Sequence, residues 1–108
     1  MDNQLVLDIV SGVYKDYISG NHLTEASTPA EWDEYHEFLD TEKLRVEQLL
    51  IDLETEPAPD LPNGENLPCI IGCIINYMLC KGGCSGMGCA IQCELEYNIC
   101  KGNCSVQG

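Results

Sequence analysis

The stretch that decides the fold is a tandem repeat, CIIGCIINYMLCKGGC at residues 69–84 and CAIQCELEYNICKGNC at residues 89–104. The two copies share 8 of 16 positions, including all four cysteines, which indicates an internal duplication. Within each copy the cysteines are spaced four, seven and four residues apart. On an α-helix this spacing places all four sulfur atoms along one narrow stripe. The repeat therefore predicts two similar helices, each with a stripe of cysteines.

The pairing of the cysteines follows from the length of the connection and the symmetry of their spacing. Only residues 85–88 separate the copies, and so short a segment favours a tight turn between antiparallel helices. The 4-7-4 spacing is its own mirror image, so antiparallel helices bring the cysteines opposite one another. Two cysteines one turn apart on the same helix are too far apart for easy bonding. The sequence thus predicts four nested disulfides: Cys69–Cys104, Cys73–Cys100, Cys80–Cys93 and Cys84–Cys89.

Three glycines interrupt the helical pattern of the first copy, and each costs about 1 kcal/mol in a helix interior. Gly82 and Gly83 are expected to end the first helix near Lys81 and to leave Cys84 in the turn. Gly72 is expected to let the two helix backbones approach closely.

A first N-terminal helix is predicted by apolar residues that recur at three- and four-residue spacing. Asp2 or Asn3 can cap its start, and Gly20 can end it. The residues of the apolar stripe are Leu5, Val6, Ile9, Val10, Val13, Tyr14 and Tyr17.

A second N-terminal helix is predicted to begin at the capping box formed by residues 28–31, TPAE, and to end at Pro57. Its apolar stripe repeats every seven residues. With the first helix it would form an αα-hairpin in which the two stripes pack on each other. The alternative is that this stripe binds a partner such as a processing enzyme, through Trp32, Leu39, Val46 and Leu53.

The charge divides the chain into two parts. Residues 1–68 hold 16 acidic and 3 basic residues, hence −13, whereas residues 69–108 hold two of each, hence zero. The prolines between them favour an extended linker, and Pro68, with Asn66 or Leu67 just before it, suits a helix start. A net charge of −13 argues against partners such as nucleic acids and anionic membrane surfaces. The predicted organisation is an acidic helical leader or partner-binding segment (1–56), a linker (57–68) and a cysteine-rich hairpin (69–108).

The predicted fold class is all-α, with an N-terminal αα-hairpin and a C-terminal disulfide-stapled antiparallel helical hairpin, which a four-helix arrangement could unite. The first copy is almost wholly apolar, whereas the second carries Gln92, Glu94, Glu96 and Asn98. This asymmetry indicates that the outer face of the first copy is buried against another surface, which leaves membrane contact of the apolar hairpin open.

The paired C-x3-C motifs of the hairpin resemble the α-hairpinins, small disulfide-stapled helical peptides that act as defence peptides, toxins or protease inhibitors. The matching residues are Cys80, Cys84, Cys89 and Cys93. The order of acidic leader, linker and cysteine-rich core resembles bacteriocin-like precursors of ribosomally made peptides. This resemblance implies an antimicrobial or toxin-like peptide that is secreted or exported after its leader has met the processing and export machinery.

Two other functions stay open. C-x3-C motifs along helices also resemble bacterial copper-storage proteins, and that resemblance implies a cytoplasmic protein that binds Cu(I) through the same eight cysteines in their reduced state. The third reading is a structural or adaptor protein in which the disulfides only staple four helices together.

An enzyme is not expected. The sequence contains no nucleotide-binding, metalloprotease or serine-hydrolase motif. Lys81 and Lys101, next to Cys80 and Cys100, are the only basic neighbours that could activate a thiol, and they are interpreted as solubilising side chains. The start of the sequence does not resemble a secretory signal, so the cytoplasm is the alternative location.

Overall fold

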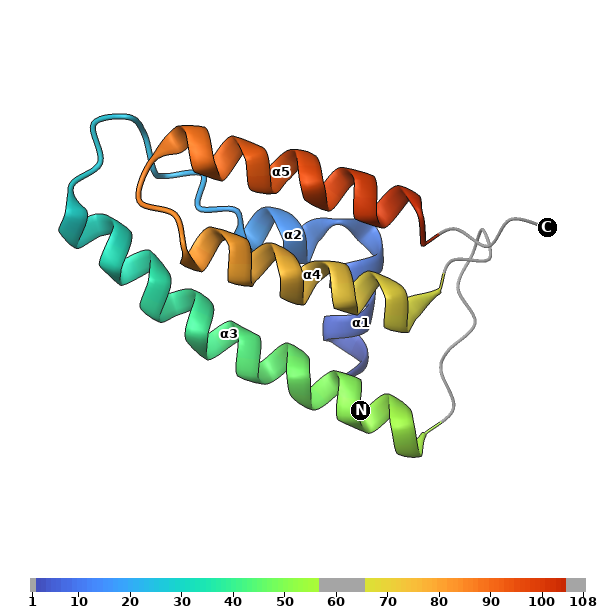
Figure 1. Ribbon diagram of the computed structural model, residues 1–108. Coiled ribbons are helices and arrows are strands. Elements are labelled where there is room, and N and C mark those ends of the chain that lie inside the picture. The colour runs from blue at the N-terminus through green and yellow to red at the C-terminus, as the bar shows by residue number, and fades with distance from the viewer. Residues whose placement is uncertain (1, 57–65, 105–108) are drawn as a thin grey trace.

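The computed structural model describes residues 2–56 and 66–104, and in these two ranges it contains five α-helices and no β-strand, which confirms the all-α class (Figure 1). The helices are α1 (Asn3–Ser11), α2 (Val13–Ile18), α3 (Pro29–Thr55), α4 (Leu67–Gly82) and α5 (Met87–Gly102).

The first N-terminal helix is divided in two at Gly12, so the prediction of a single helix is wrong. Gly12 has φ = 87°, in the left-handed region that glycine adopts without the steric cost of a side chain. Its amide donates to the carbonyl of Ile9, which ends α1 and lets α2 start in a new direction. Because of this change, Val13 and Tyr17 of the expected apolar stripe are exposed. The predicted cap is confirmed at Asp2, whose side chain accepts from the amide of Leu5.

Helix α3 begins at the predicted capping box. The hydroxyl of Thr28 accepts from the amide of Glu31 at 3.2 Å, and the carboxylate of Glu31 accepts from the amide of Thr28 at 3.0 Å. The helix ends at Thr55, just ahead of Pro57. Two tyrosines join α2 to α3. The hydroxyl of Tyr14 donates to Glu42 at 3.1 Å, and that of Tyr35 donates to the carbonyl of Ile18 at 2.5 Å.

Helix α4 is the central element, because it packs against α5, α3 and α1 (Figure 1). It is capped by Asn66, whose side chain accepts from the amide of Cys69 at 3.1 Å. Leu67 and Pro68, which the sequence placed in the linker, are therefore the first two residues of α4. The remaining linker residues, 57–65, lie outside the described residues.

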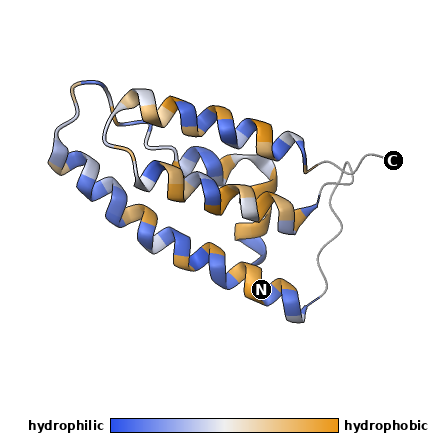
Figure 2. Cartoon of the chain, in the orientation of Figure 1, coloured by the Kyte–Doolittle hydropathy of each residue, from blue (hydrophilic) through white to orange (hydrophobic). Residues whose placement is uncertain are grey.

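The N-terminal segment and the cysteine-rich hairpin share one hydrophobic core (Figure 2). The inward face of α3 meets the face of α4 that points away from α5. This answers a question that the sequence left open, namely whether the two parts touch. The fully buried residues of the core on α3 and α4 include Leu39, Leu49, Ile70, Ile71, Ile74, Tyr77 and Met78.

The glycines of α4 act differently from one another. The helix ends at Gly82, with Cys84 in the segment that follows, which confirms the predicted end. The predicted role of Gly72 is wrong: a Cβ atom built there would meet no neighbouring atom within 4 Å. The approach of α4 to α5 is instead made at the cysteines.

Candidate functional site

The structure joins α4 and α5 by a ladder of four disulfides, which are the four pairs expected from the mirror-symmetric spacing. The Cα–Cα distances across the rungs lie between 5.5 and 5.8 Å, which is the usual range for disulfides. No described cysteine is free. The rungs are Cys69–Cys104, Cys73–Cys100, Cys80–Cys93 and Cys84–Cys89.

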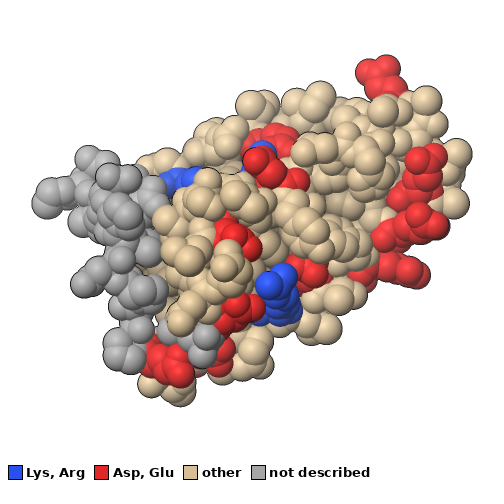
Figure 3. All heavy atoms as spheres, turned by 180° about the vertical axis from the view of Figure 1, so that it is seen from behind, with Lys and Arg blue, Asp and Glu red and all other residues tan. Residues whose placement is uncertain are grey.

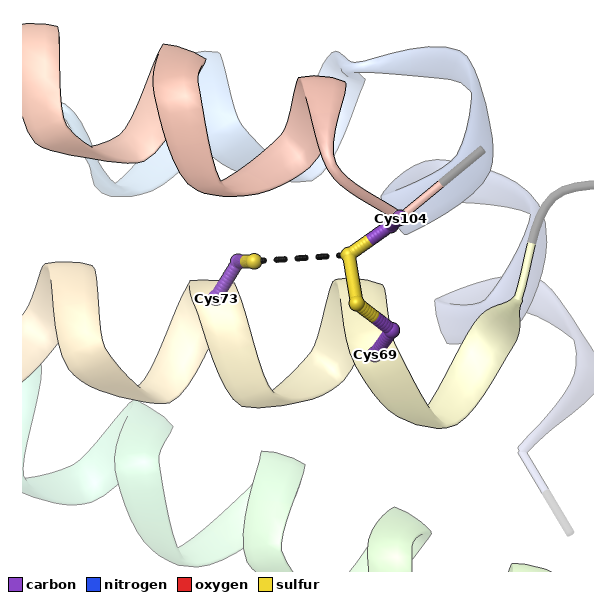
Figure 4. A group of neighbouring side chains, drawn as sticks. All are labelled: Cys69, Cys73 and Cys104. Atoms are coloured by element: carbon purple, nitrogen blue, oxygen red, sulfur yellow. Dashed lines mark hydrogen bonds between the residues drawn. A yellow bond between two sulfur atoms is a disulfide. The ribbon is translucent and has the colours of Figure 1, made fainter. Parts of the chain in front are cut away.

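At each end of the ladder, neighbouring rungs bring three sulfur atoms together. The sulfur atoms of Cys69, Cys73 and Cys104 all lie within 4.8 Å of one another, and Figure 4 shows Cys73 pointing from α4 toward Cys104, 3.5 Å away. At the other end, Cys84 lies 3.6 Å from Cys93, and Cys80 completes the group.

Between these two ends, the seven-residue gap in the ladder is filled by aromatic rings. The centroids of Tyr77 and Tyr97 lie 5.2 Å apart, with a tilt of 56° between the ring planes. A pocket of about 280 Å³ beside the rings is lined by Asn76 and Glu96 and by the two central rungs. The repeat explains this pair, because the two tyrosines occupy equivalent positions in the two copies.

The outer face of α4 is covered by the N-terminal segment, as the asymmetry of the repeat predicted. Of the four residues predicted to bind a partner, Trp32, Leu39 and Val46 are buried in the core of this chain, and Leu53 is partly buried against it. The seven-residue stripe of α3 thus packs within the molecule. Its main neighbour is α4, whereas the sequence pointed to the first N-terminal helix.

A cluster of charged and polar side chains lies beside this covered face and centres on Glu94 of α5. The carboxylate of Glu94 forms an ion pair with Lys15 of α2, accepts a hydrogen bond from Tyr77 of α4, and lies 3.4 Å from the Nζ atom of Lys81. Lys81 also donates to the carbonyl of Ser19 at 3.1 Å. Glu94 and Lys81 therefore link the hairpin to the segment around α2.

Burial shifts the pKa values of this cluster. Burial lowers the pKa of Lys81, which is only 4% exposed, and the charge of Glu94 opposes part of that shift. Burial alone would raise the pKa of Glu94, but hydrogen bonds from Lys15 and Tyr77 and the charges of both lysines lower it overall. Burial also raises the pKa of Tyr77, and the neighbouring carboxylate adds to the effect. The geometry thus favours a charged Glu94 between two cations.

Sequence reasoning missed this cluster, and its interpretation of Lys81 as a solubilising side chain is wrong. In the sequence, Glu94 is one of several polar residues in the second copy of the repeat. One signal was present: both copies contain Tyr and Lys four residues apart, at Tyr77–Lys81 and Tyr97–Lys101, which places the two side chains on one face of a helix. What the repeat could not indicate is the partner, because Lys15 and Ser19 lie near the other end of the chain.

One histidine reaches the cysteine-rich hairpin. The Nε2 atom of His36 lies 2.6 Å from the carbonyl oxygen of Cys84, so Nε2 carries the proton and donates. This contact holds the end of α4 against α3. It involves the backbone of Cys84, whose sulfur is bonded to Cys89.

Comparisons of this chain with protein-family models, with curated proteins and with solved structures found no match. Over residues 2–56 and 66–104, no helix combines the length and apolarity that crossing a bilayer requires.

Proposed function

We propose that this chain is the precursor of a small, membrane-acting peptide, the disulfide hairpin, and that its acidic N-terminal helices are a cover removed by processing. The proposal assigns no catalytic residue. Cleavage in the linker by a processing enzyme, together with export, would release the hairpin outside the cell. The hairpin would then act by placing the uncovered apolar face of α4 in the surface of a target membrane.

The observation that carries the proposal is the burial of one face of α4 beneath the N-terminal helices. Ile70, Ile71 and Ile74 are fully buried, and Met78 is 2% exposed. Burying a side chain of this size contributes about 1.5–3 kcal/mol, so these four contribute roughly 6–12 kcal/mol. The same residues would be open to solvent or lipid in a separate hairpin, which four covalent rungs would still hold together.

The distribution of charge supports a cover that keeps the hairpin from membranes. The 16 acidic and 3 basic residues of positions 1–68 account for the whole net charge of −13. Carboxylates are spread over the face of the molecule seen from behind, where basic side chains are few (Figure 3). Anionic lipids repel such a surface. The hairpin residues 69–108 carry two acids and two bases, so their release removes the repulsion.

The test is controlled cleavage of the full chain. A site for a specific protease is placed within residues 57–65, and dye leakage is measured from vesicles of phosphatidylcholine and phosphatidylglycerol. We expect the intact chain to be inactive and the cleaved chain to cause leakage. Ile74→Asp should abolish leakage by the cleaved chain, whereas Leu79→Asp, which makes the same change at a residue already 54% exposed, should retain it.

A structural or adaptor protein is the second candidate, and the Glu94 cluster favours it. The ion pair between Lys15 and Glu94 joins α2 to α5 across the boundary between cover and hairpin. If the cleaved fragments stay together in native mass spectrometry in the presence of vesicles, and the dye is retained, the precursor proposal fails and the structural role is supported.

A further inference from the structure

We infer that two copies of this chain associate through the outer face of α5, as an antiparallel pair of helices. Helix α5 packs chiefly against α4 and lies along one edge of the molecule (Figure 1). The inference concerns the intact chain and does not rest on the precursor proposal. The outer face consists of Gly88, Ile91, Gln92, Leu95, Asn98, Ile99 and Gly102, all of which are exposed.

The cysteines fix which side of α5 points outward. Cys93 points toward α4, where it is bonded to Cys80. At 100° per residue, Leu95 lies about 160° from Cys93 around the helix axis, so it points away from α4. Ile91 and Ile99, one turn to either side of Leu95, lie on the same side, and the three are 56%, 67% and 53% exposed, respectively. A contiguous apolar stripe of this kind marks an interaction surface, whereas a single exposed aliphatic residue does not.

The outer face carries no charged residue, although the chain as a whole carries −13. Two copies therefore repel one another least when they approach through this face. The two acidic residues of α5 lie beside the face, and one of them, Glu94, is turned toward Lys15 of α2. A basic partner would be drawn to the carboxylates on other parts of the surface, and anionic lipids would be repelled by them (Figure 3). An uncharged stripe on so acidic a chain favours a second copy.

The order of residues on the outer face is mirror-symmetric about Leu95. An isoleucine lies four residues to either side of it, and a side-chain amide lies three residues to either side. A twofold axis through Leu95 then gives an antiparallel pair in which Ile91 is level with the partner's Ile99. Leu95 meets its own copy, and Gly88 is level with the partner's Gly102. A twofold interface needs a self-complementary surface of this kind.

The two glycines leave room for the helices to approach closely. A Cβ atom built at Gly88 or at Gly102 would meet no neighbouring atom within 4 Å, so the space above both ends of the face is open. At 1.5 Å per residue the face is about 21 Å long. One pair of helices of this length buries less than the roughly 1,200 Å² at which stable interfaces begin. We therefore expect a weak dimer with a micromolar Kd.

The test is analytical ultracentrifugation of the full, unreduced chain from micromolar to millimolar concentration. The Kd of the dimer should fall as salt rises from about 0.01 to about 0.15 M, because the Debye length shortens from roughly 30 to about 8 Å and the repulsion is screened. Leu95→Glu should raise the Kd about tenfold or more, since two carboxylates then face each other at the axis. Leu79→Glu is the matched control, because it makes the same change at a residue of α4 that is 54% exposed, and it should keep the wild-type Kd.

Mixtures of variants test the register and the direction of the pair. Leu95→Glu and Leu95→Lys should each be monomeric alone and should associate when mixed, because residue 95 meets itself. Ile99→Glu mixed with Ile91→Lys should associate more tightly than either variant alone, because these two positions are level in an antiparallel pair. A parallel pair would place each of them beside its own copy and would give no gain.

Several outcomes would overturn the inference. A wild-type chain that stays monomeric up to millimolar concentration, a Kd that rises with salt, or an equal loss in Leu95→Glu and Leu79→Glu would each do so. No gain in either mixture would overturn the antiparallel register. A monomeric wild-type chain that floats with phosphatidylcholine vesicles, with flotation lost in Leu95→Glu, would make the outer face a lipid-binding surface instead. Far-ultraviolet circular dichroism checks that each variant keeps its helices.

Discussion

Replacing Glu94 by glutamine is expected to destabilise the oxidised protein although it leaves all four disulfides in place. The glutamine side chain has the same shape and can still accept a hydrogen bond from Tyr77. It loses the negative charge that faces Lys15 and Lys81. Lys81 then keeps its charge in a site where its side chain is 5% exposed, without a carboxylate to balance it.

The expected loss in the free energy of unfolding follows from the distance between the charges and from their exposure. Two unit charges 3.4 Å apart attract by about 5 kcal/mol at an effective dielectric constant of about 20. Removing one partner of a fully buried pair costs roughly 3–5 kcal/mol. The side chain of Glu94 is 28% exposed, so water screens part of the interaction. We expect the free energy of unfolding to fall by about 2–3 kcal/mol.

The assay is guanidinium unfolding of the unreduced protein at neutral pH, followed by circular dichroism. Glu96→Gln is the matched control, because it makes the same change on the same helix at an exposed site, and its effect should stay within about 0.5 kcal/mol. In the background of Lys81→Met, Glu94→Gln should cost clearly less than it does alone. Equal stability of the Glu94→Gln and Glu96→Gln proteins would refute the reasoning.

Three further predictions concern the core, the glycines and pH. Ile74→Ala should cost about 2–5 kcal/mol and Leu79→Ala less than about 0.5 kcal/mol, both measured from denaturant midpoints, since only Ile74 is buried. Gly72→Ala should stabilise α4 by about 0.5–1 kcal/mol, because the added methyl group meets no neighbouring atom. Gly20→Ala should destabilise the protein, since φ is +71° and the ring of Tyr35 lies 2.9 Å from the added Cβ atom. Thermal melts should show a higher midpoint for the first variant and a lower one for the second. The folded protein lowers the pKa of Glu94, so the charge of Glu94 stabilises the protein fully above the ordinary pKa of 4.5, and this stabilisation is lost as the pH falls through the lowered pKa. The Glu94→Gln protein should therefore lose less stability on acidification than the wild type. An equally steep loss in both proteins would contradict the prediction.

The features that the sequence predicted are those encoded within short stretches of chain. The capping box at residues 28–31 needs only four residues, and the disulfide ladder needs only the cysteine spacing and a short turn. The end of α4 at Gly82 follows from local backbone preference in the same way. The apolar first copy also indicated that one face of α4 is covered.

The features that the sequence did not predict depend on contacts between distant segments. A glycine inside a helix costs only about 1 kcal/mol, so the sequence alone allows the helix to continue through Gly12. The helix ends there because packing α1 and α2 in different directions stabilises the protein more than a continuous helix would. Lys81 looked like a solvent-exposed lysine until Ser19 and Glu94 were found to bind it.

Disulfide mapping tests the central claim most directly, because the stapled hairpin depends on the order of the rungs. The unreduced chain is digested with pepsin at low pH, where disulfide exchange is suppressed, and the linked peptides are identified by mass spectrometry. The account predicts four links, each between one copy of the repeat and the other: Cys69–Cys104, Cys73–Cys100, Cys80–Cys93 and Cys84–Cys89. A link between two cysteines of the same copy, such as Cys69–Cys73, would contradict it.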